Sequence, residues 1–370
     1  MRQRIIVVGA GVVGLTCGVR LAESGVDVDV LARDLPPETA SAAGGAVWLP
    51  LLAAPGSRFT ELALGTLPVL RELAEVDGSG VRLLTGHLHT AGTGRPRWLD
   101  AVTHVVPAVQ ESDPRAGGGA DGGRSPGAGG TRASRSGPPG AGAGTWWRLQ
   151  VPVVAISFYL GHLRTRLADA GGTVTRLPLA RLPEQGLVVN CTGSSARALA
   201  DDPQVRPVHG RTVVLADPGL DAWWGEEVPG GDAVRYVLPH GREVVVGQVA
   251  GPDAAQDPPA SPAGTPAGPP VGTLGRTSVG TPAETPVRAS VAALAQSAGA
   301  LVPALRGATV LGHRSGQVPQ RPEIRLDVVR RQGAEDAREA VVHCYGHGDS
   351  GVTTSWGCAD AVAALVAECR

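Results

Sequence analysis

Three closely spaced glycines stand near the start of the chain, in the stretch GAGVVG that begins at Gly9. An apolar run over residues 4–8 precedes them and suits a strand covered on both faces, and apolar residues at helical spacing follow over 12–24. In this context Gly9 permits a tight turn, Gly11 lets the backbone approach a pyrophosphate, and Gly14 lets helix and strand pack closely. The unpaired N–H groups at the helix start would face the phosphates. The stretch therefore predicts an adenine dinucleotide site, with a merely structural tight turn as the alternative.

A carboxylate stands where the ribose of such a nucleotide would lie. Asp34 follows Gly14 by twenty residues and ends a second expected strand, 26–32, so its side chain could accept hydrogen bonds from ribose hydroxyls. The glycines alone do not separate FAD from NAD, but two later segments favour FAD. The small and hydroxyl residues of 38–50 suit close passage beside a long cofactor, and the apolar run 186–193 suits a strand ending at the same sheet edge. Ordinary loops are the alternative for both segments.

The composition excludes other chemistries. The chain contains no lysine, which rules out a Schiff base to pyridoxal phosphate and a Walker-type phosphate loop. The formal net charge of −1 gives no field that would steer nucleic acid or an acidic membrane, so a small-molecule partner is expected. Five cysteines are scattered without metal-ligand spacing, four of them in apolar segments, which predicts buried free thiols and no metal site. They are Cys17, Cys191, Cys344, Cys358 and Cys369.

Helices and strands that would position these residues follow one another along the chain. Strands are expected at 4–8, 26–32, 81–90, 146–156, 186–193 and 211–217, with a hairpin over 233–249 that turns near His240 and two strands within 322–345. Helices are expected at 12–24, 157–170, 289–305 and in the C-terminal apolar segment, and over 59–76 with an interruption near Pro68. Two low-complexity inserts, 113–145 and 251–288, cannot repay their ordering entropy and are predicted to be flexible or disordered.

Nothing in the sequence predicts passage through or across a membrane. The first apolar run is broken by glycine and lacks a cleavage site, which argues against a signal peptide. No stretch reaches the roughly 18 uninterrupted apolar residues that a membrane span needs. A cytoplasmic protein is therefore expected.

The sequence resembles the D-amino-acid oxidase family of flavoproteins almost from end to end, apart from the two inserts. The motifs that carry the resemblance are VVGAGVVGLTCG, ARDLPPETASAAGGAVWLP, VVNCTG, RYVLPHG, RPEIRL and YGHGDSGVTTSWGCA. D-aspartate oxidases and glycine oxidases share parts of this pattern. The resemblance implies an α/β fold with a Rossmann-type FAD-binding domain built from 1–50, 146–200 and 300–370. A mainly β substrate domain would be built from 51–112 and 201–250.

The resemblance also implies which residues contact FAD. The N-terminal turn would hold the cofactor through Gly9, Ala10, Gly11, Val12, Val13 and Gly14, with Arg33 and Asp34 near the adenosine ribose. The resemblance further implies that the chain passes close to the cofactor at Thr39, Ser41, Gly45 and Ala46. The residues around the flavin would be Gly348, Ser350, Gly351, Val352 and Thr353. The last helix begins near Gly351, and its dipole could stabilise negative charge on a reduced flavin; a glycine helix cap is the alternative.

Oxidation of a D-amino acid is the reaction that the resemblance implies. The α-hydrogen would leave as hydride to the flavin, the imino acid would hydrolyse to a keto acid and ammonia, and oxygen would reoxidise the flavin with formation of hydrogen peroxide. This chemistry needs orientation more than a protein base, so no catalytic residue is assigned. The partners would be a D-amino acid or amine and oxygen, and a homodimer is left open.

The stretch GQVPQRPEIRL departs from the family at the position that grips the substrate. Relatives carry G-L-R-P-x-R-P-x-x-R-L, whose first arginine binds the substrate α-carboxylate through two hydrogen bonds. An alignment without gaps puts Val318 at the position of this arginine. Tyr236 matches the assisting tyrosine, and Asp349 matches a glycine beside the substrate amine. A further tyrosine of some relatives falls on Asp232. Arg314 shares the strand face of Val318 and could reach in through a bulge.

Two functions therefore stay open. One is an FAD oxidase of neutral or basic D-amino acids or of a related amine, because Asp349 would favour a cation and oppose a second carboxylate. The other is a flavin-binding homologue with lost or altered substrate use, an inactive paralogue for example, because a carboxylate without its arginine would lose several powers of ten in catalytic efficiency. The intact flavin-proximal segment favours the enzyme, and His347 within it is expected to bond loop backbone rather than to polarise the flavin.

Overall fold

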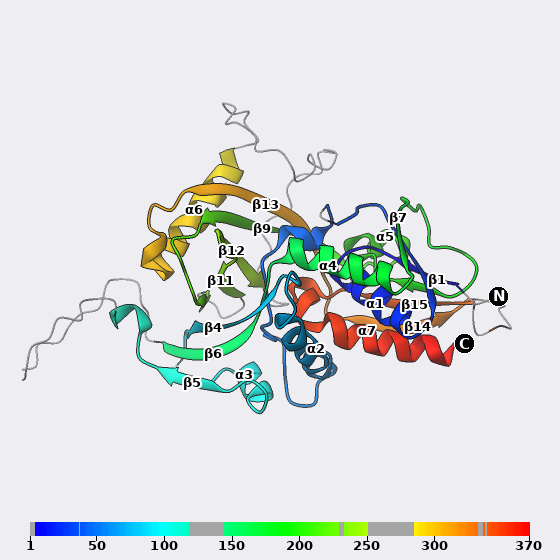
Figure 1. The fold of residues 1–370 in the computed structure, drawn as a ribbon, viewed down its shortest axis with the longest axis horizontal. Helices are drawn as coiled ribbons and strands as arrows, with labels where there is room; N and C mark the ends of the chain where they lie inside the picture. The colour runs from blue at the N-terminus through cyan, green and yellow to red at the C-terminus, as the bar shows by residue number, and fades with distance from the viewer. Residues whose placement is uncertain are drawn as a thin grey trace, which may run out of the picture.

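The computed structural model describes residues 4–36, 38–92, 94–117, 144–228, 233–250, 285–331, 336 and 339–370. Within them, two β-sheets lie side by side along the long axis of the molecule, with both chain ends on the side of the smaller sheet (Figure 1). Most of the two predicted inserts and Asp232 lie outside the described residues.

The smaller sheet has six strands in the order β14-β15-β8-β1-β2-β7. Its strands are β1 (Arg4–Val8), β2 (Asp27–Ala32), β7 (Thr173–Arg176), β8 (Val188–Asn190), β14 (Arg325–Arg330) and β15 (Ala340–Tyr345). All neighbours pair in parallel except β14 with β15. Because both faces of a parallel sheet are covered, β1 is an apolar run in which Ile5 and Val7 are fully buried. This confirms the predicted Rossmann-type sheet.

Helices cover the smaller sheet. They are α1 (Val12–Glu23), α4 (Ile156–Asp169) and α7 (Gly351–Glu368), and α1 packs against the other two (Figure 1). The predicted first helix and the stop at Gly25 are confirmed, since Gly25 takes a φ of +82° that favours glycine. Each of these helices is apolar toward the sheet, so tertiary packing rather than intrinsic propensity stabilises it.

The larger sheet has nine strands, eight of them in the order β13-β9-β12-β11-β10-β4-β6-β3, while β5 pairs with β6. The strands are β3 (Ala46–Val47), β4 (Val81–Thr90), β5 (Ala108–Glu111), β6 (Thr145–Val154), β9 (Arg206–Ala216), β10 (Trp223–Glu227), β11 (Ala233–Pro239), β12 (Glu243–Ala250) and β13 (Val310–Gln320). Only β10 and β4 are parallel. The predicted hairpin is confirmed, because β11 and β12 pair antiparallel and the His240 N–H donates to the Glu243 carbonyl at 2.7 Å.

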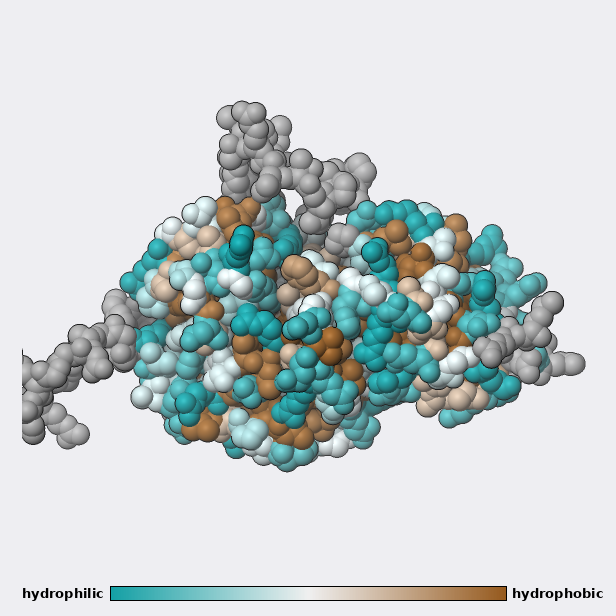
Figure 2. Space-filling model, viewed as in Figure 1, coloured by the Kyte–Doolittle hydropathy of each residue, from teal (hydrophilic) through white to brown (hydrophobic). Residues whose placement is uncertain are grey.

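The remaining helices and the 3₁₀ turns complete the described secondary structure. They are α2 (Arg58–Ala74), α3 (Arg97–Val102), α5 (Ala196–Leu199) and α6 (Thr285–Leu301), with the 3₁₀ turns η1 (Ala40–Ala43), η2 (Pro114–Gly117), η3 (Gly193–Ser195), η4 (Pro303–Leu305) and η5 (Gly348–Ser350). Helix α6 packs against β9 and β12 of the larger sheet. No helix of the described residues is long and apolar enough to cross a bilayer, and hydrophilic residues with smaller apolar patches between them cover the face in Figure 2.

Three strands lie in the other sheet from the one that the predicted domain boundaries imply. Strands β3, β6 and β13 fall within the segments assigned to the flavin domain, but they pair with β6, β4 and β9 in the larger sheet. An apolar strand pattern fixes which face is buried but not which strand is its neighbour. The boundaries of the two domains therefore stay a prediction, and these three strands do not follow them.

Helix α2 runs unbroken through Pro68, so the predicted interruption there is wrong. A proline inside a helix removes one backbone hydrogen bond and crowds the preceding turn at a cost of about 3 kcal/mol. The cost is offset by packing against α7, where a Cβ on Gly65 would stand 3.3 Å from the Cα of Gly357. The Gly357 N–H also donates to the Thr66 hydroxyl at 3.0 Å, which ties the two helices together.

Candidate functional site

The glycine turn has the close packing that its sequence predicts. Gly9 follows β1 with a φ of +113°, and a Cβ there would overlap the carbonyl oxygen of Cys191 at the end of β8. A Cβ on Gly14 would overlap the carbonyl oxygen of Gly9 in turn. Side chains at either position would push α1 away from the sheet. The turn is therefore a backbone surface held between two parallel strands.

Two helix N-termini meet at this turn. Helix α1 begins at Val12 without a side-chain cap from Gly11 and without an acidic residue in its first turn. Helix α7 begins at Gly351, likewise without a side-chain cap or an acid, and a Cβ on Gly351 would stand 3.4 Å from Val12 Cγ1. The Val12 N–H donates to the Ser41 hydroxyl at 3.1 Å, which brings η1 to the same place. Unpaired N–H groups and the two helix dipoles favour an anion here.

The residues predicted to contact the adenosine and the middle of the cofactor lie around the turn. The hydroxyl of Thr39 is buried and has no hydrogen-bond partner among the described residues, so a ligand with a polar atom would satisfy it. Asp34 lies just beyond the carboxyl end of β2 with its side chain 36% exposed, and its carboxylate accepts a hydrogen bond from Arg33 at 2.7 Å. That hydrogen bond raises the pKa of the Arg33 guanidinium. These features fit the phosphates and ribose of an adenine dinucleotide.

A second group of predicted residues gathers where the larger sheet meets this turn. The Gly45 N–H donates to the Tyr236 hydroxyl at 3.0 Å, and the Tyr236 side chain is only 3% exposed. Burial raises the pKa of Tyr236, and the negative charge of the nearby Asp349 carboxylate raises it further. The phenol therefore stays protonated and keeps a hydrogen to donate at neutral pH.

Turn η5, which carries Asp349, packs against β13. A Cβ on Gly348 would stand 2.9 Å from the Gln320 side-chain oxygen, so Gln320 lines the same corner although the sequence analysis did not single it out. The sequence offered little reason to select Gln320, because a polar residue at such a position on a strand can have many roles. The structure thus brings Gly45, Tyr236, Gln320 and Asp349 together from four segments.

Val318 lies two residues before Gln320 on the same strand and is half-buried. It pairs with Val208 of β9, and its Cγ2 stands 3.0 Å from where a Cβ on Gly210 would be. Arg314 lies on the same face, as predicted, but four residues along a strand span about 13 Å. Its guanidinium is paired with Glu243 at 3.2 Å, so it would have to leave that carboxylate to approach Val318.

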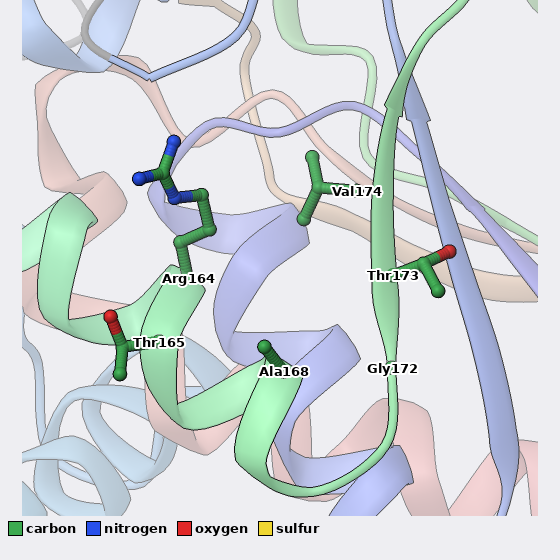
Figure 3. Close-up of a pocket in the computed structure, with 6 residues that line it drawn as sticks. All are labelled: Arg164, Thr165, Ala168, Gly172, Thr173 and Val174. Carbon is green, nitrogen blue, oxygen red and sulfur yellow. The ribbon is translucent and has the colours of Figure 1, made fainter.

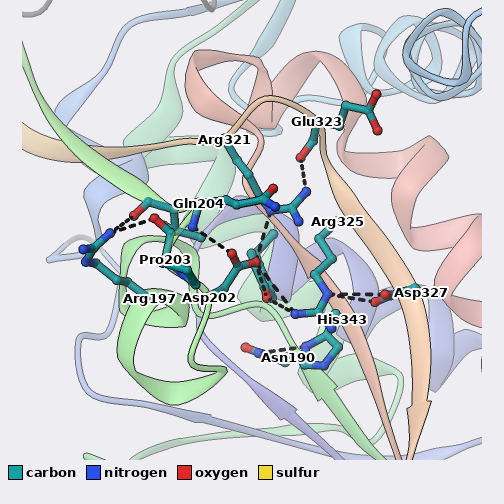
Figure 4. Close-up of polar contacts among 12 residues, drawn as sticks. Asn190, Arg197, Asp202, Pro203, Gln204, Arg321, Glu323, Arg325, Asp327 and His343 are labelled. Carbon is teal, nitrogen blue, oxygen red and sulfur yellow. Dashed lines mark hydrogen bonds and ion pairs between the residues drawn. The ribbon is translucent and has the colours of Figure 1, made fainter.

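The two arginines of the RPEIRL motif, Arg321 and Arg325, form ion pairs and hydrogen bonds within the protein (Figure 4). Arg321 donates to Asp202 at 3.1 Å, and Tyr345 donates to the same carboxylate at 3.0 Å. Arg325 donates to the Tyr345 hydroxyl at 2.7 Å. Although burial disfavours the charge of Asp202, the hydrogen bonds from Tyr345 and Gln204 and the charge of Arg321 lower its pKa. This network fastens the end of β13 and the start of β14 to β15.

Four of the five cysteines gather in the core directly beneath the glycine turn. All five are buried and free, which confirms the predicted thiols. The imidazole of His347 faces this cluster, with Nε2 at 3.4 Å from Cys358 Sγ, instead of bonding loop backbone through that nitrogen. This gathering could not be predicted from the sequence, because the four thiols come from four separate segments of the chain.

A surface hollow of about 400 Å³ lies between α4 and the start of β7 (Figure 3). It is lined by Arg164, Thr165, Ala168, Gly172, Thr173 and Val174, none of which the sequence analysis singled out. Thr173 pairs with Asp29, near the amino end of β2. The glycine turn lies at the carboxyl ends of the strands, where ligands bind in sheets of this kind, so the hollow is not the candidate site.

Comparison with known proteins agrees with this geometry. The family model described as FAD dependent oxidoreductase (DAO) matches residues 4–130 and 142–365, nearly the whole chain. The chain belongs to this family. Its fold class is therefore the Rossmann-type α/β fold of the FAD oxidoreductases, and FAD is its cofactor.

The most similar curated relatives include two bacterial proteins named D-amino-acid oxidase. The protein of Rubrobacter xylanophilus is 36% identical over 98% of this chain and 95% of its own length. The protein of Streptomyces coelicolor is 35% identical over 98% of this chain and 96% of its own length. These relatives confirm the resemblance to D-amino-acid oxidases.

Solved structures share the fold at low sequence identity. Glycine oxidase from Geobacillus kaustophilus has a TM-score of 0.66 at 19% identity, over all of this chain and 96% of that one. L-Proline dehydrogenase from P. horikoshii has a TM-score of 0.68 at 12% identity, over 99% of this chain and 94% of that one. The fold thus accommodates different substrates, and the substrate depends on the residues of the pocket.

Proposed function

We propose that this protein is an FAD-dependent oxidase of neutral or basic D-amino acids, or of related amines, with oxygen as the electron acceptor. The products would be an imine that hydrolyses to a carbonyl compound and ammonia, together with hydrogen peroxide. Bound FAD would supply the two-electron acceptor. Support comes from the two relatives named D-amino-acid oxidase, and the observation that carries the proposal is the Tyr236–Asp349 pair beside the start of α7.

Each pocket residue has a defined task in this proposal. The Tyr236 hydroxyl, fixed by the Gly45 N–H, would donate a hydrogen bond to the substrate. The Asp349 carboxylate would attract the substrate ammonium and orient the nitrogen after it loses a proton. Val318 would offer an apolar wall, against which a substrate carboxylate finds no charged partner. The Asp349 carboxylate would also repel a second carboxylate, so acidic D-amino acids would be the least favoured substrates.

Loss of turnover is the second candidate, and Val318 is the observation that favours it. A flavin-binding homologue with an inactive pocket would keep the glycine turn and the two helix starts while losing contacts to substrate. The glycine turn shows no departure from the family pattern, whereas Val318 and Asp349 do. The oxidase remains the main proposal. Simple loss of function would only remove contacts to the substrate, whereas Asp349 adds a charged group to the pocket.

Peroxide release and flavin reduction test the proposal together. The purified holoprotein would be offered D-alanine, D-proline, D-lysine, D-arginine, D-aspartate and simple primary amines, and peroxide would be measured. Anaerobic mixing would show whether each compound bleaches the flavin absorbance. Neutral or basic compounds are expected to react and D-aspartate to fail. A holoprotein whose flavin no member of the panel bleaches would support the inactive homologue instead.

A further inference from the structure

A fully buried cluster of four thiols and one imidazole lies in the core between the smaller sheet and its helices. Cys17 comes from α1, Cys191 follows β8, Cys344 ends β15, His347 precedes η5 and Cys358 comes from α7. The donor atoms form two groups that share Cys344. In one group the sulfurs of Cys17, Cys191 and Cys344 lie within 4.8 Å of one another, and in the other so do the donors of Cys344, His347 and Cys358.

The distances from His347 to the two thiols of the second group are close to the edges of a zinc tetrahedron. His347 Nε2 lies 3.4 Å from Cys358 Sγ and 4.0 Å from Cys344 Sγ. With Zn–S bonds of about 2.3 Å and Zn–N bonds of about 2.0–2.1 Å, ligand atoms stand about 3.5–3.8 Å apart. Small side-chain shifts would therefore close these three donors around one ion. Cys17 and Cys191 lie within 4.8 Å of Cys344 but outside the group that Cys344 forms with His347 and Cys358, so either would have to move toward the ion to become its fourth ligand.

The charges of the cluster suit a divalent cation. A buried ion is tolerated only where its charge is nearly balanced, and two thiolates with one neutral imidazole neutralise Zn²⁺. A third thiolate would leave one negative charge and complete the Cys₃His set, which zinc takes in structural sites. We propose that Cys344, His347 and Cys358 bind one structural Zn²⁺, with the thiolate of Cys17 or Cys191 as the fourth ligand.

The position of this site gives it a role beyond the oxidase reaction. Cys191 lies under the glycine turn, where its carbonyl oxygen abuts Gly9. His347 is the residue before η5, so it stands two positions from Asp349. A zinc ion would fasten β15, η5 and α7 to one another, and its fourth ligand would join them to α1 through Cys17 or to the end of β8 through Cys191. The glycine turn and η5 would thereby be held in fixed positions relative to each other. The metal takes no part in the proposed oxidation, and the site exists whether or not the pocket turns over substrate.

Metal content of the full-length holoprotein tests the inference. The protein would be expressed with zinc in the medium, purified without chelators and dialysed, and zinc per polypeptide would be measured by mass spectrometry. About one zinc per chain is expected. X-ray absorption at the zinc edge should then show sulfur at about 2.3 Å and nitrogen at about 2.0–2.1 Å, a signature that needs no variant and no activity.

Cys369 provides the matched control, since it is also buried and free but lies outside the cluster at the end of α7. Cys369→Ser should keep its zinc, whereas Cys358→Ser and His347→Gln should bind zinc at least roughly 10- to 100-fold more weakly. Wild-type protein that stays free of zinc after refolding with Zn²⁺ would overturn the inference. So would zinc that shows only nitrogen and oxygen ligands, or zinc that survives the combined loss of Cys344 and Cys358. Peroxide production, measured alongside, reports on the oxidase proposal independently.

Discussion

At the scale of single residues, the candidate pocket combines a family framework with two substitutions that each make the pocket more negative. Tyr236 keeps its place and its backbone partner Gly45. Val318 removes a cation from the predicted carboxylate site, and Asp349 adds an anion near Tyr236. Both changes weaken attraction for a substrate carboxylate, so they act in the same direction on substrate choice.

Replacement of Val318 by arginine should restore a grip on the α-carboxylate. Hydrogen bonds to charged groups contribute about 1.5–3 kcal/mol each, so a bidentate contact should raise kcat/KM for D-alanine and D-proline by roughly 10²- to 10⁴-fold. Gln317→Arg is the control, because Gln317 is exposed and faces away from Val318 on β13. A Val318→Arg holoprotein that stays silent toward both amino acids would show that this position does not explain the altered pocket.

His343 should make the protein sensitive to acid. Burial, with the charge of Arg325 as a smaller cause, lowers the pKa of His343 from 6.5 to about 4. Between these values the unfolded chain binds a proton that the folded chain does not, so the free energy of unfolding falls as the pH drops from 6.5 to about 4. The loss should total on the order of 3 kcal/mol, and stability should be fully present above pH 6.5.

Urea unfolding at pH values from 7 to 4.5 checks this prediction. His343→Gln keeps a polar partner for Asn190, which lies 3.2 Å from the imidazole, and should flatten the pH dependence over this window. His313→Gln changes an exposed histidine of β13 and should leave the curve of the wild type. Equal pH dependence in all three proteins would remove His343 as the cause.

At the scale of elements, the crossing of α2 and α7 fixes the position of α7, whose start adjoins the turn η5. Gly65 and Gly357 let the backbones touch, and Thr66 bonds across the crossing. The same crossing keeps α2 continuous through Pro68. Because α7 begins at Gly351 beside α1, its placement also determines where the second helix dipole points.

A methyl group at this crossing should destabilise the fold. A Cβ on Gly357 would overlap the carbonyl oxygen of Leu62, which is backbone and cannot move aside cheaply. Gly357→Ala should lower the free energy of unfolding by about 1–3 kcal/mol or more, measured by urea denaturation of the apoprotein. Gly161→Ala is the matched control inside α4, where nothing stands within 4 Å of the added Cβ, and should stabilise the protein by about 0.5–1 kcal/mol. Similar effects of both variants would mean that the helices do not cross in contact.

At the scale of the whole molecule, the candidate cofactor site lies where the two sheets meet. The glycine turn and both helix starts belong to the smaller sheet, while Tyr236 and β13 belong to the larger one. Segment 39–46 connects them, since Ser41 bonds to Val12 and Gly45 bonds to Tyr236. A ligand that spans this junction should therefore stabilise the molecule as a unit.

Addition of FAD to flavin-free protein should raise the melting temperature. At a free FAD concentration of 100 times its Kd, binding stabilises the native state by about 2.7 kcal/mol. FMN lacks the adenosine half that the α1 turn and Asp34 are predicted to hold, so it should stabilise far less at the same concentration. Thermal unfolding with each nucleotide measures the difference. Equal shifts with FMN and FAD would contradict the predicted dinucleotide turn.

Local features of the sequence alone determined the dinucleotide turn and most strands and helices. Gly9 is required by its own φ of +113° and Gly14 by contact with the nearby Gly9 carbonyl, and the hairpin 233–249 follows from alternation around a short turn. Such patterns are visible in sequence because their causes are local. The family motifs added Tyr236, Gly45 and the start of α7 to the features that could be predicted from the sequence.

Only the tertiary structure decided the rest. The sheet that receives β6 and β13, the passage of α2 through Pro68 and the gathering of Cys17, Cys191, Cys344 and Cys358 depend on segments far apart in the chain. Contacts between such segments depend on how whole helices and strands pack, and the spacing of residues within one segment carries no information about them. The thiols show this most plainly, because Cys17 and Cys344 stand hundreds of positions apart in sequence and within 4.8 Å in the core.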